Sequence, residues 1–204
     1  ATADAFIKSG QYKSILLVGA EIQTRVIEFS NRGRDVSVLF GDGAGAAILQ
    51  ASETQPTSEN NERGLIDHVM GSDGSGADLL LIRRPGMSGP EEFISEQETR
   101  NRAYNPYMEG SHVFKNAVSH MSAALSTLLD RNGISPQQLD LLIPHQANLR
   151  ISEMVRRKFG LPETKVFNNI HKYGNTTAAT LPLCMSEAES EGRLKKGDLI
   201  ATVA

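Results

Sequence analysis

The sequence has 204 residues, of which 39% are hydrophobic and 22% are charged, values that are typical of a globular protein and exclude a disordered or fibrous one. Its 21 basic and 24 acidic side chains leave a net charge of -3, which excludes nucleic-acid binding through bulk charge. The single cysteine excludes a disulfide framework and a cysteine zinc cage, and no apolar run is long enough to cross a bilayer. We therefore expect a cytoplasmic protein that binds neither nucleic acid nor membrane.

The two ends of the sequence are unusual for chain termini. The opening ATADAFIKSG predicts the last turns of an amphipathic helix, with Ala3, Phe6 and Ile7 on one face and Gly10 as its stop. The closing LIATVA predicts an apolar strand that ends abruptly. We therefore expect a piece of a longer protein, cut at both ends.

The hydrophobic pattern between these ends predicts an α/β protein. Short apolar runs predict strands at residues 14–20, 36–40, 46–49, 65–70, 79–82, 139–143, 166–170 and 199–203. Apolar residues at helical spacing predict helices over residues 111–130, 149–159 and 175–191. Residues 50–63 predict a polar loop, and residues 83–105 a long surface excursion that serves as a lid or an interface arm. Strands that alternate with helices indicate a sheet packed under helices.

Two polar side chains stand where an α/β sheet binds ligands. His145, in IPHQAN, directly follows the strand predicted at 139–143, and Asn175, in YGNTTAA, follows the strand predicted at 166–170. Ligands of α/β sheets bind beyond the carboxyl ends of the strands. A histidine and an asparagine together supply two N–H donors that can hold a developing oxyanion, such as a thioester enolate. Each alone is more often a structural histidine or a helix N-cap, so it is the pair that indicates catalysis.

Other motifs predict no metal or dinucleotide site. Gly41, Gly43 and Gly45 do not form GxGxxG, and we expect them to serve close backbone packing. The remaining histidines lack metal-ligand spacing.

Several segments resemble the β-ketoacyl-acyl carrier protein synthase III family of the thiolase superfamily. DLLIPHQANLRI and NNIHKYGNTTAAT resemble its C-terminal half, RDVSVLFGDGAGAAIL its central segment, and KSILLVGAE the strand before that. The resemblance covers nearly the whole chain in the order of the family. It implies a thiolase-like layered α/β fold, present in part: residues 1–54 as the remainder of the N-terminal half and 55–204 as an incomplete C-terminal half.

The resemblance also implies a reaction. The family joins an acyl-CoA to malonyl-acyl carrier protein by decarboxylative Claisen condensation, using a Cys–His–Asn triad and no metal or redox cofactor. His145 and Asn175 match its histidine and asparagine. The nucleophilic cysteine would lie about two helical turns before Ala1, so this sequence does not contain it, and we expect Cys184 to be a buried packing residue. The parent protein is then an acyltransferase and a homodimer, whereas this chain alone, without the nucleophile, is expected to form no acyl-enzyme and to be inactive in the complete condensation.

The resemblance implies two further sets of residues. The set expected to bind CoA comprises Arg34, at the adenine end, and Gly110, Phe114, Ala147 and Asn148, along the pantetheine tunnel. From the residues alone, Arg34 is equally well a solvated loop charge, and Phe114 a core residue. The set expected to dock the acidic acyl carrier protein comprises Lys115, Arg150, Arg156, Arg157 and Lys158. We favour docking through complementary charge over a merely solvated face.

Two alternatives remain open at this point. One is a related condensing enzyme or acyltransferase of secondary metabolism, because the quoted motifs do not define the acyl chain. The other is a fragment that performs no catalysis.

Overall fold

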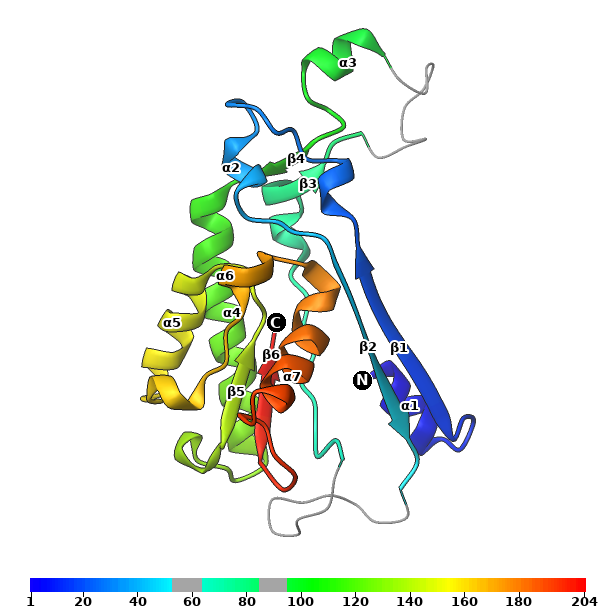
Figure 1. Ribbon diagram of the computed structural model, residues 1–204, viewed down its shortest axis with the longest axis vertical. Helices are drawn as coiled ribbons and strands as arrows, with labels where there is room; N and C mark the ends of the chain where they lie inside the picture. The colour runs from blue at the N-terminus through cyan, green and yellow to red at the C-terminus, as the bar shows by residue number, and fades with distance from the viewer. Residues whose placement is uncertain (53–63, 85–94) are drawn as a thin grey trace.

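The computed structural model describes residues 1–52, 64–84 and 95–204 (Figure 1). Its helices are α1 (Thr2–Lys8), α2 (Arg34–Ser37), α3 (Glu96–Arg100), α4 (Gly110–Arg131), α5 (Leu149–Lys158), α6 (Ile170–Tyr173) and α7 (Thr180–Ser190). Its strands are β1 (Ser14–Glu21), β2 (Gly43–Gln50), β3 (Leu80–Ile82), β4 (Pro106–Met108), β5 (Leu141–Pro144) and β6 (Ile200–Val203). Short 3₁₀ turns occur at Gln23–Arg25, Gly74–Leu79, Pro136–Gln138, Glu163–Lys165 and Thr177–Ala179. Within this described part, no helix is long and apolar enough to cross a membrane.

The C-terminal half is built in three layers around the parallel pair β5 and β6. The strands pair from Leu141 opposite Ile200 to Pro144 opposite Val203. Successive side chains of a strand point to opposite faces. Leu142 therefore joins the apolar cluster under α4 and α5, whereas Leu141 joins the cluster that includes Cys184 of α7. Figure 1 shows α4 and α5 on one side of this pair and α7 on the other.

The helices of this half confirm the predicted periodicity. Met121, Leu125 and Leu129 of α4 recur every four residues and are each at most 3% exposed. They form one buried stripe, as an amphipathic helix requires. α5 ends at Lys158, and Gly160 follows with φ +62°, a left-handed conformation that favours glycine. The predicted stop after the first helix is confirmed in the same way, since Gly10 has φ +76°.

β1 and β2 form an antiparallel ribbon that lies against the start of α7 (Figure 1). The ribbon approaches this segment through glycines. A Cβ atom on Gly45 would lie 2.8 Å from Cγ of Pro182, and one on Gly43 would lie 2.8 Å from Cγ2 of Thr176. A Cβ atom on Gly19, which pairs with Gly45 across the ribbon, would lie 2.7 Å from the carbonyl oxygen of Ala178. The predicted role of the glycine motif in close packing is confirmed.

The strand predicted at residues 36–40 is wrong. Residues 34–37 form α2, whose backbone N–H groups at Val36 and Ser37 both donate to the carbonyl of Gly33, at 3.0 and 2.9 Å. Val36 is 2% exposed but Val38 is 75% exposed, so only one of the valines contributes to packing. The β propensity of the valines is a weak preference, and tertiary context overrides it here.

Residues 65–70 were predicted as a strand and form none. Side-chain hydrogen bonds from the end of α4 hold this segment instead. The carboxylate of Asp67 accepts hydrogen bonds from Nε of Arg131 at 2.7 Å and from Nδ2 of Asn132 at 2.8 Å. These bonds, with that of Arg131 foremost, lower the pKa of Asp67 to about 2. The backbone is thus anchored without a neighbouring strand.

In the C-terminal half, the strand predicted at residues 166–170 and the helix predicted at residues 175–191 are partly wrong. Val166 makes a single bridge to Leu142, and α6 begins at Ile170, so residues 166–170 are not a full strand. The helix predicted from residue 175 begins only at Thr180. Thr177 interrupts it with φ +47°, a left-handed conformation that no helix continues.

The two predicted loops lie partly outside the described residues. Residues 53–63 and 85–94 are not described, and the predicted boundary at residue 54 falls in the first of these gaps, so it stays a prediction. Within the excursion, residues 96–100 form α3. Arg102 connects the excursion to the loop before α2: its Nη1 donates to the carbonyl of Arg32 at 2.7 Å, and its Nε lies 2.9 Å from Glu28.

Candidate active site

His145 stands at the carboxyl end of β5, as the sequence predicts. Its backbone N–H donates to the carbonyl of Val203 at 2.7 Å, which extends the pairing of β5 with β6 by one residue. Nδ1 of the ring lies 2.6 Å from the hydroxyl of Thr180, the first residue of α7. Burial lowers the pKa of His145 below the ordinary value for imidazole. Burial therefore favours the neutral ring over the imidazolium.

Asn175 is held by both its backbone and its side chain. Its backbone forms a bridge to Phe40, with N–H donating to the carbonyl of Leu39 at 2.8 Å and its carbonyl accepting from the N–H of Gly41 at 3.0 Å. Its side-chain Oδ1 accepts from the backbone N–H of Thr177 at 2.9 Å. Because Oδ1 is committed to this turn, Nδ2 is the group of the amide that is left to donate to a ligand.

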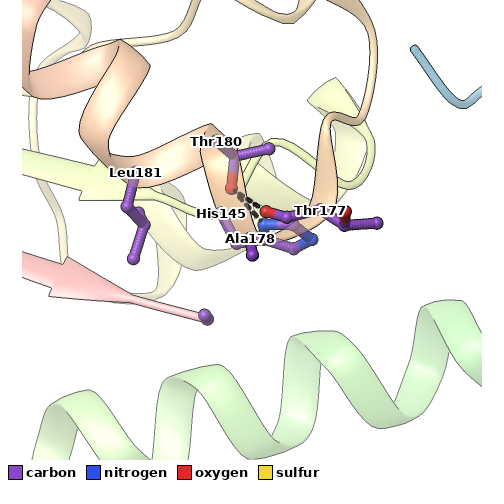
Figure 2. Close-up of a pocket in the computed structure, with 6 residues that line it drawn as sticks. His145, Thr177, Ala178, Thr180 and Leu181 are labelled. Atoms are coloured by element: carbon purple, nitrogen blue, oxygen red, sulfur yellow. Dashed lines mark hydrogen bonds between the residues drawn. The ribbon is translucent and has the colours of Figure 1, made fainter. Parts of the chain in front are cut away.

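Thr177 links the two candidate catalytic side chains. Its N–H holds Oδ1 of Asn175, and its carbonyl lies 2.8 Å from the hydroxyl of Thr180, which in turn contacts His145. Figure 2 shows the Thr180 hydroxyl between the His145 ring and the carbonyl of Thr177, with dashed lines to both. The left-handed backbone of Thr177 costs roughly 1–2 kcal/mol. Such strain persists only where the surroundings impose it, and it is concentrated at functional sites.

A pocket of about 260 Å³ opens beside His145 (Figure 2). Its lining is His145, Thr177, Ala178, Thr180, Leu181 and Ala204. Asn175 does not line this pocket, although it contacts the same turn through Thr177. The space beside His145 is thus formed by the start of α7 and the end of β6.

Gln146 connects the strand end that carries His145 to the segment that leads to Asn175. This side chain is 2% exposed. Its Nε2 donates to the carbonyl of Pro144 at 2.6 Å, and its Oε1 accepts from the backbone N–H groups of Asn169 and Ile170 at 3.0 and 3.1 Å. Because this buried amide makes all three hydrogen bonds, it fixes the end of β5 relative to the start of α6.

Sequence reasoning did not predict roles for Gln146, Thr177 or Thr180. A signal was present for two of them, since PHQAN and GNTTAAT place an amide directly after His145 and a hydroxyl group five residues after Asn175. Thr177 acts through its backbone N–H and carbonyl, which no side-chain pattern indicates.

Cys184 is a fully buried residue of α7, as predicted. Its Sγ lies 2.9 Å from Oδ1 of Asn169, and the side chain packs in the cluster with Leu141 and Ile143. Burial raises the pKa of the Cys184 thiol to about 12. The thiolate is the nucleophilic form of cysteine, so this thiol is unsuited to catalysis near pH 7.

The residues predicted to bind CoA do not line the pocket beside His145. Asn148 is the N-cap of α5 and accepts from the N–H of Arg150 at 2.9 Å. Phe114 and Ala147 are half-buried against the core cluster of α4 and α5. Arg34 begins α2 and Gly110 begins α4, and both are exposed. Their roles in binding stay predictions.

The predicted docking cluster comprises four exposed side chains and one that is largely buried. Lys115, Arg150 and Lys158 are exposed. The side chain of Arg157 is 73% exposed, and its Nε lies 3.8 Å from the carboxylate of Glu153. Arg156 is 14% exposed; its guanidinium donates to the carboxylate of Glu153, at 2.8 Å for the shortest bond, and to the carbonyl of Leu161 at 2.7 Å. Arg156 therefore stabilises the end of α5, whereas the other cations face solvent.

No group of three or more His, Cys, Asp or Glu side chains that could hold a metal ion occurs within residues 1–52, 64–84 and 95–204.

The class of protein follows from solved structures with the same fold. The structure superposes on the 3-oxoacyl-[acyl-carrier-protein] synthase III of Aquifex aeolicus with a TM-score of 0.80 at 36% identity, covering 98% of this chain and 56% of that one. The corresponding enzyme of Pseudomonas aeruginosa gives a TM-score of 0.81 at 33% identity over 98% of this chain and 57% of that one. The fold is therefore thiolase-like and α/β, present in part.

Sequence comparison narrows the class to a family. Residues 1–74 match the model for 3-oxoacyl-[acyl-carrier-protein (ACP)] synthase III, and residues 129–204 match the model for its C-terminal part. The β-ketoacyl-[acyl-carrier-protein] synthases III of Caldanaerobacter subterraneus and Paracoccus denitrificans are 39% and 40% identical over the full length of this chain. The chain belongs to the 3-oxoacyl-[acyl-carrier-protein] synthase III family, and it spans 58% of the length of these two relatives.

Proposed function

We propose that this chain supplies the histidine and asparagine of a β-ketoacyl-acyl carrier protein synthase III active site, which condenses an acyl-CoA with malonyl-acyl carrier protein to start fatty acid synthesis. One observation carries the proposal: the strained turn at Thr177 contacts both Asn175 directly and His145 through Thr180. These two side chains, far apart in the sequence, thereby belong to one site.

The proposed chemistry is the decarboxylation that precedes condensation. In a malonyl thioester, the bond between the carboxylate carbon and the methylene carbon breaks, and its electron pair stays on the remaining fragment as an enolate. The negative charge collects on the thioester oxygen. N–H donors that are already in place stabilise that charge without reorganisation. Nδ2 of Asn175 is one such donor, and Nε2 of His145 is the second when it carries a proton.

The remaining roles follow from the same proposal. Exposed Lys115, Arg150, Arg157 and Lys158 would attract an acidic carrier protein and speed its docking. Arg34, Gly110, Phe114, Ala147 and Asn148 would contact the CoA and pantetheine groups. In this proposal the reaction uses acyl-CoA and malonyl-acyl carrier protein as substrates and no resident cofactor, and the parent protein is a cytoplasmic homodimer.

Decarboxylation is the step that tests the proposal on this chain. The chain is incubated with malonyl-acyl carrier protein, and the release of CO2 is measured. Asn175→Ala is expected to lower the rate by about 100-fold or more, as loss of one oxyanion donor does. His145→Ala is expected to lower the rate as well, because the protonated ring is the second donor. His171→Ala is the matched control, because His171 is exposed on α6 and is expected to leave the rate unchanged. Equal CO2 release by wild type and His145→Ala, or no release above background by wild type, contradicts the proposal.

A second measurement separates the proposal from catalysis by Cys184. After incubation with acetyl-CoA, the intact mass of the chain is expected to remain unchanged, because burial and the raised pKa protect the only thiol. A stable acetyl adduct on Cys184 would overturn this reading of the site.

A related condensing reaction is the second candidate. The structure also superposes on the priming β-ketosynthase of the R1128 polyketide pathway, with a TM-score of 0.77 at 29% identity over 98% of this chain. The two candidates differ in the acyl group that they accept. Comparing acetyl-CoA with longer and aromatic acyl-CoAs in the complete parent protein distinguishes them: preference for acetyl-CoA favours the first candidate.

A further inference from the structure

The contacts of the Thr180 hydroxyl restrict where the proton of the His145 ring lies. Oγ1 of Thr180 is 2.6 Å from Nδ1 of His145 and 2.8 Å from the carbonyl oxygen of Thr177. Both distances are those of hydrogen bonds. A hydroxyl has one proton to donate, and a carbonyl oxygen has none.

Only one arrangement makes both contacts favourable. If the Thr180 hydroxyl donated to Nδ1, its oxygen would face the Thr177 carbonyl oxygen at 2.8 Å with no proton between them. The lone pairs of the two oxygens would then repel. The carbonyl has its other lone pair engaged by the backbone N–H of Thr180. If the hydroxyl donates to the carbonyl, it can accept from Nδ1–H of His145, and every contact is satisfied.

We infer that Thr180 is a positioning residue that holds neutral His145 as the Nδ1–H tautomer, so that an unprotonated Nε2 faces the pocket. This inference deepens the proposed function and rests on it for its catalytic meaning. The turn contributes, because the Thr177 carbonyl accepts from both the backbone N–H and the hydroxyl of Thr180. The pKa of His145, which burial lowers, is consistent with a neutral ring.

The two candidate donors are therefore not equivalent. The Asn175 amide donates through Nδ2 regardless of pH, because it does not titrate. Neutral His145 accepts a hydrogen bond at Nε2, from a thiol, a hydroxyl or water, and donates to an oxyanion only as the imidazolium. Thr180 thus decides that His145 begins as an acceptor.

Ring ¹⁵N chemical shifts test the inference, because they distinguish a protonated from an unprotonated imidazole nitrogen. Spectra of the ¹⁵N-labelled chain are recorded at about pH 8, above the ordinary imidazole pKa. The variant His145→Gln assigns the ring by loss of its signals. Wild type and Thr180→Ser, which keeps the hydroxyl, are expected to show Nδ1 protonated. Thr180→Val, which has nearly the same shape, is expected to shift the tautomer ratio toward Nε2–H by about three- to tenfold, which corresponds to one lost hydrogen bond.

Each outcome of this experiment decides the inference. A protonated Nε2 in the wild type overturns it, and so does an unchanged ratio in Thr180→Val. If Thr180→Val does not fold, the wild-type and Thr180→Ser spectra still decide the tautomer, and Thr180→Ala takes the place of the valine variant. The spectra require no turnover. Nε2–H with normal CO2 release therefore contradicts the tautomer alone, whereas Nδ1–H without CO2 release contradicts the proposed function alone.

Discussion

The C-terminal layers and the β1/β2 ribbon both contain strands with large apolar side chains, yet these side chains differ sharply in burial. Leu142 and Ile143 of β5 are 0% exposed, because helices cover both faces of their sheet. Leu16 and Val18 of β1 are 63% and 65% exposed, and Ile48 of β2 is 69% exposed. An apolar strand sequence therefore indicates that a strand is suited to burial, and the elements packed on it decide whether it is buried.

The ribbon is attached to the rest of the described chain through its glycines. Gly19 and Gly45 place backbone against Ala178 and Pro182, at the start of α7. Leu16, Val18 and Ile48 contribute little to this contact, since they are exposed. This difference predicts that the C-terminal layers are stabilised by the volume of their buried side chains. The contact between the ribbon and α7 instead requires that Gly19 and Gly45 carry no side chain.

The largest expected effect comes from truncating a core leucine. Leu142→Ala removes a fully buried side chain, so it is expected to lower the free energy of unfolding by about 2–5 kcal/mol. The matched variant Leu16→Ala removes an exposed leucine and should change it by less than about 0.5 kcal/mol. Urea unfolding measures both. Similar losses for the two variants would show that the ribbon is buried in solution.

Adding a methyl group where the ribbon meets α7 is expected to have the next largest effect. A Cβ atom on Gly45 would lie 2.8 Å from Cγ of Pro182, so Gly45→Ala should cost about 1–3 kcal/mol through overpacking. Hydrogen exchange should accelerate in β1 and β2 but not in β5 and β6. Gly71→Ala is the control, since a Cβ atom there meets nothing within 4 Å. Unchanged exchange in Gly45→Ala would refute the glycine contact.

The buried thiol should make the stability of the C-terminal layers depend on pH. An unfolded cysteine has a pKa of about 8.5, whereas the pKa of Cys184 in the folded chain is raised to about 12. Between these values the folded state binds more protons than the unfolded state, so stability falls as pH rises, by about 1 kcal/mol per pH unit. Urea unfolding of wild type and Cys184→Ala at pH 8 to 10 measures the difference. Parallel curves for the two proteins would argue against this shift.

The smallest expected effect on stability comes from replacing a buried serine of α4. Ser122 is 0% exposed, and within the described residues its hydroxyl has no hydrogen-bond partner. Ser122→Ala should leave stability unchanged or raise it by less than about 1 kcal/mol. Ser152 of α5 is equally buried, but its hydroxyl donates to Oδ1 of Asn168 at 2.6 Å, so Ser152→Ala should lower stability by about 1 kcal/mol. Thermal unfolding compares the two, and equal losses would contradict the assignment.

The sequence by itself determined two central elements of the C-terminal half, α4 and β5. The spacing of Met121, Leu125 and Leu129 identifies α4, and the apolar run LDLLI identifies β5, because both patterns follow from the local geometry of a helix and a strand. His145 and Asn175 could also be selected, since each follows a predicted strand. The glycine motif also indicated close packing correctly. Every second residue of a strand lies on one face, and glycines there leave room for a neighbouring backbone.

Only the tertiary structure decided how these pieces are used. Val36 and Val38 have the same propensity, but contacts from distant segments bury one and expose the other. The link from Asn175 through Thr177 and Thr180 to His145 depends on a left-handed residue and on groups 35 positions apart. No local pattern encodes such a link, because the strain at Thr177 is tolerated only when the surrounding contacts compensate for it.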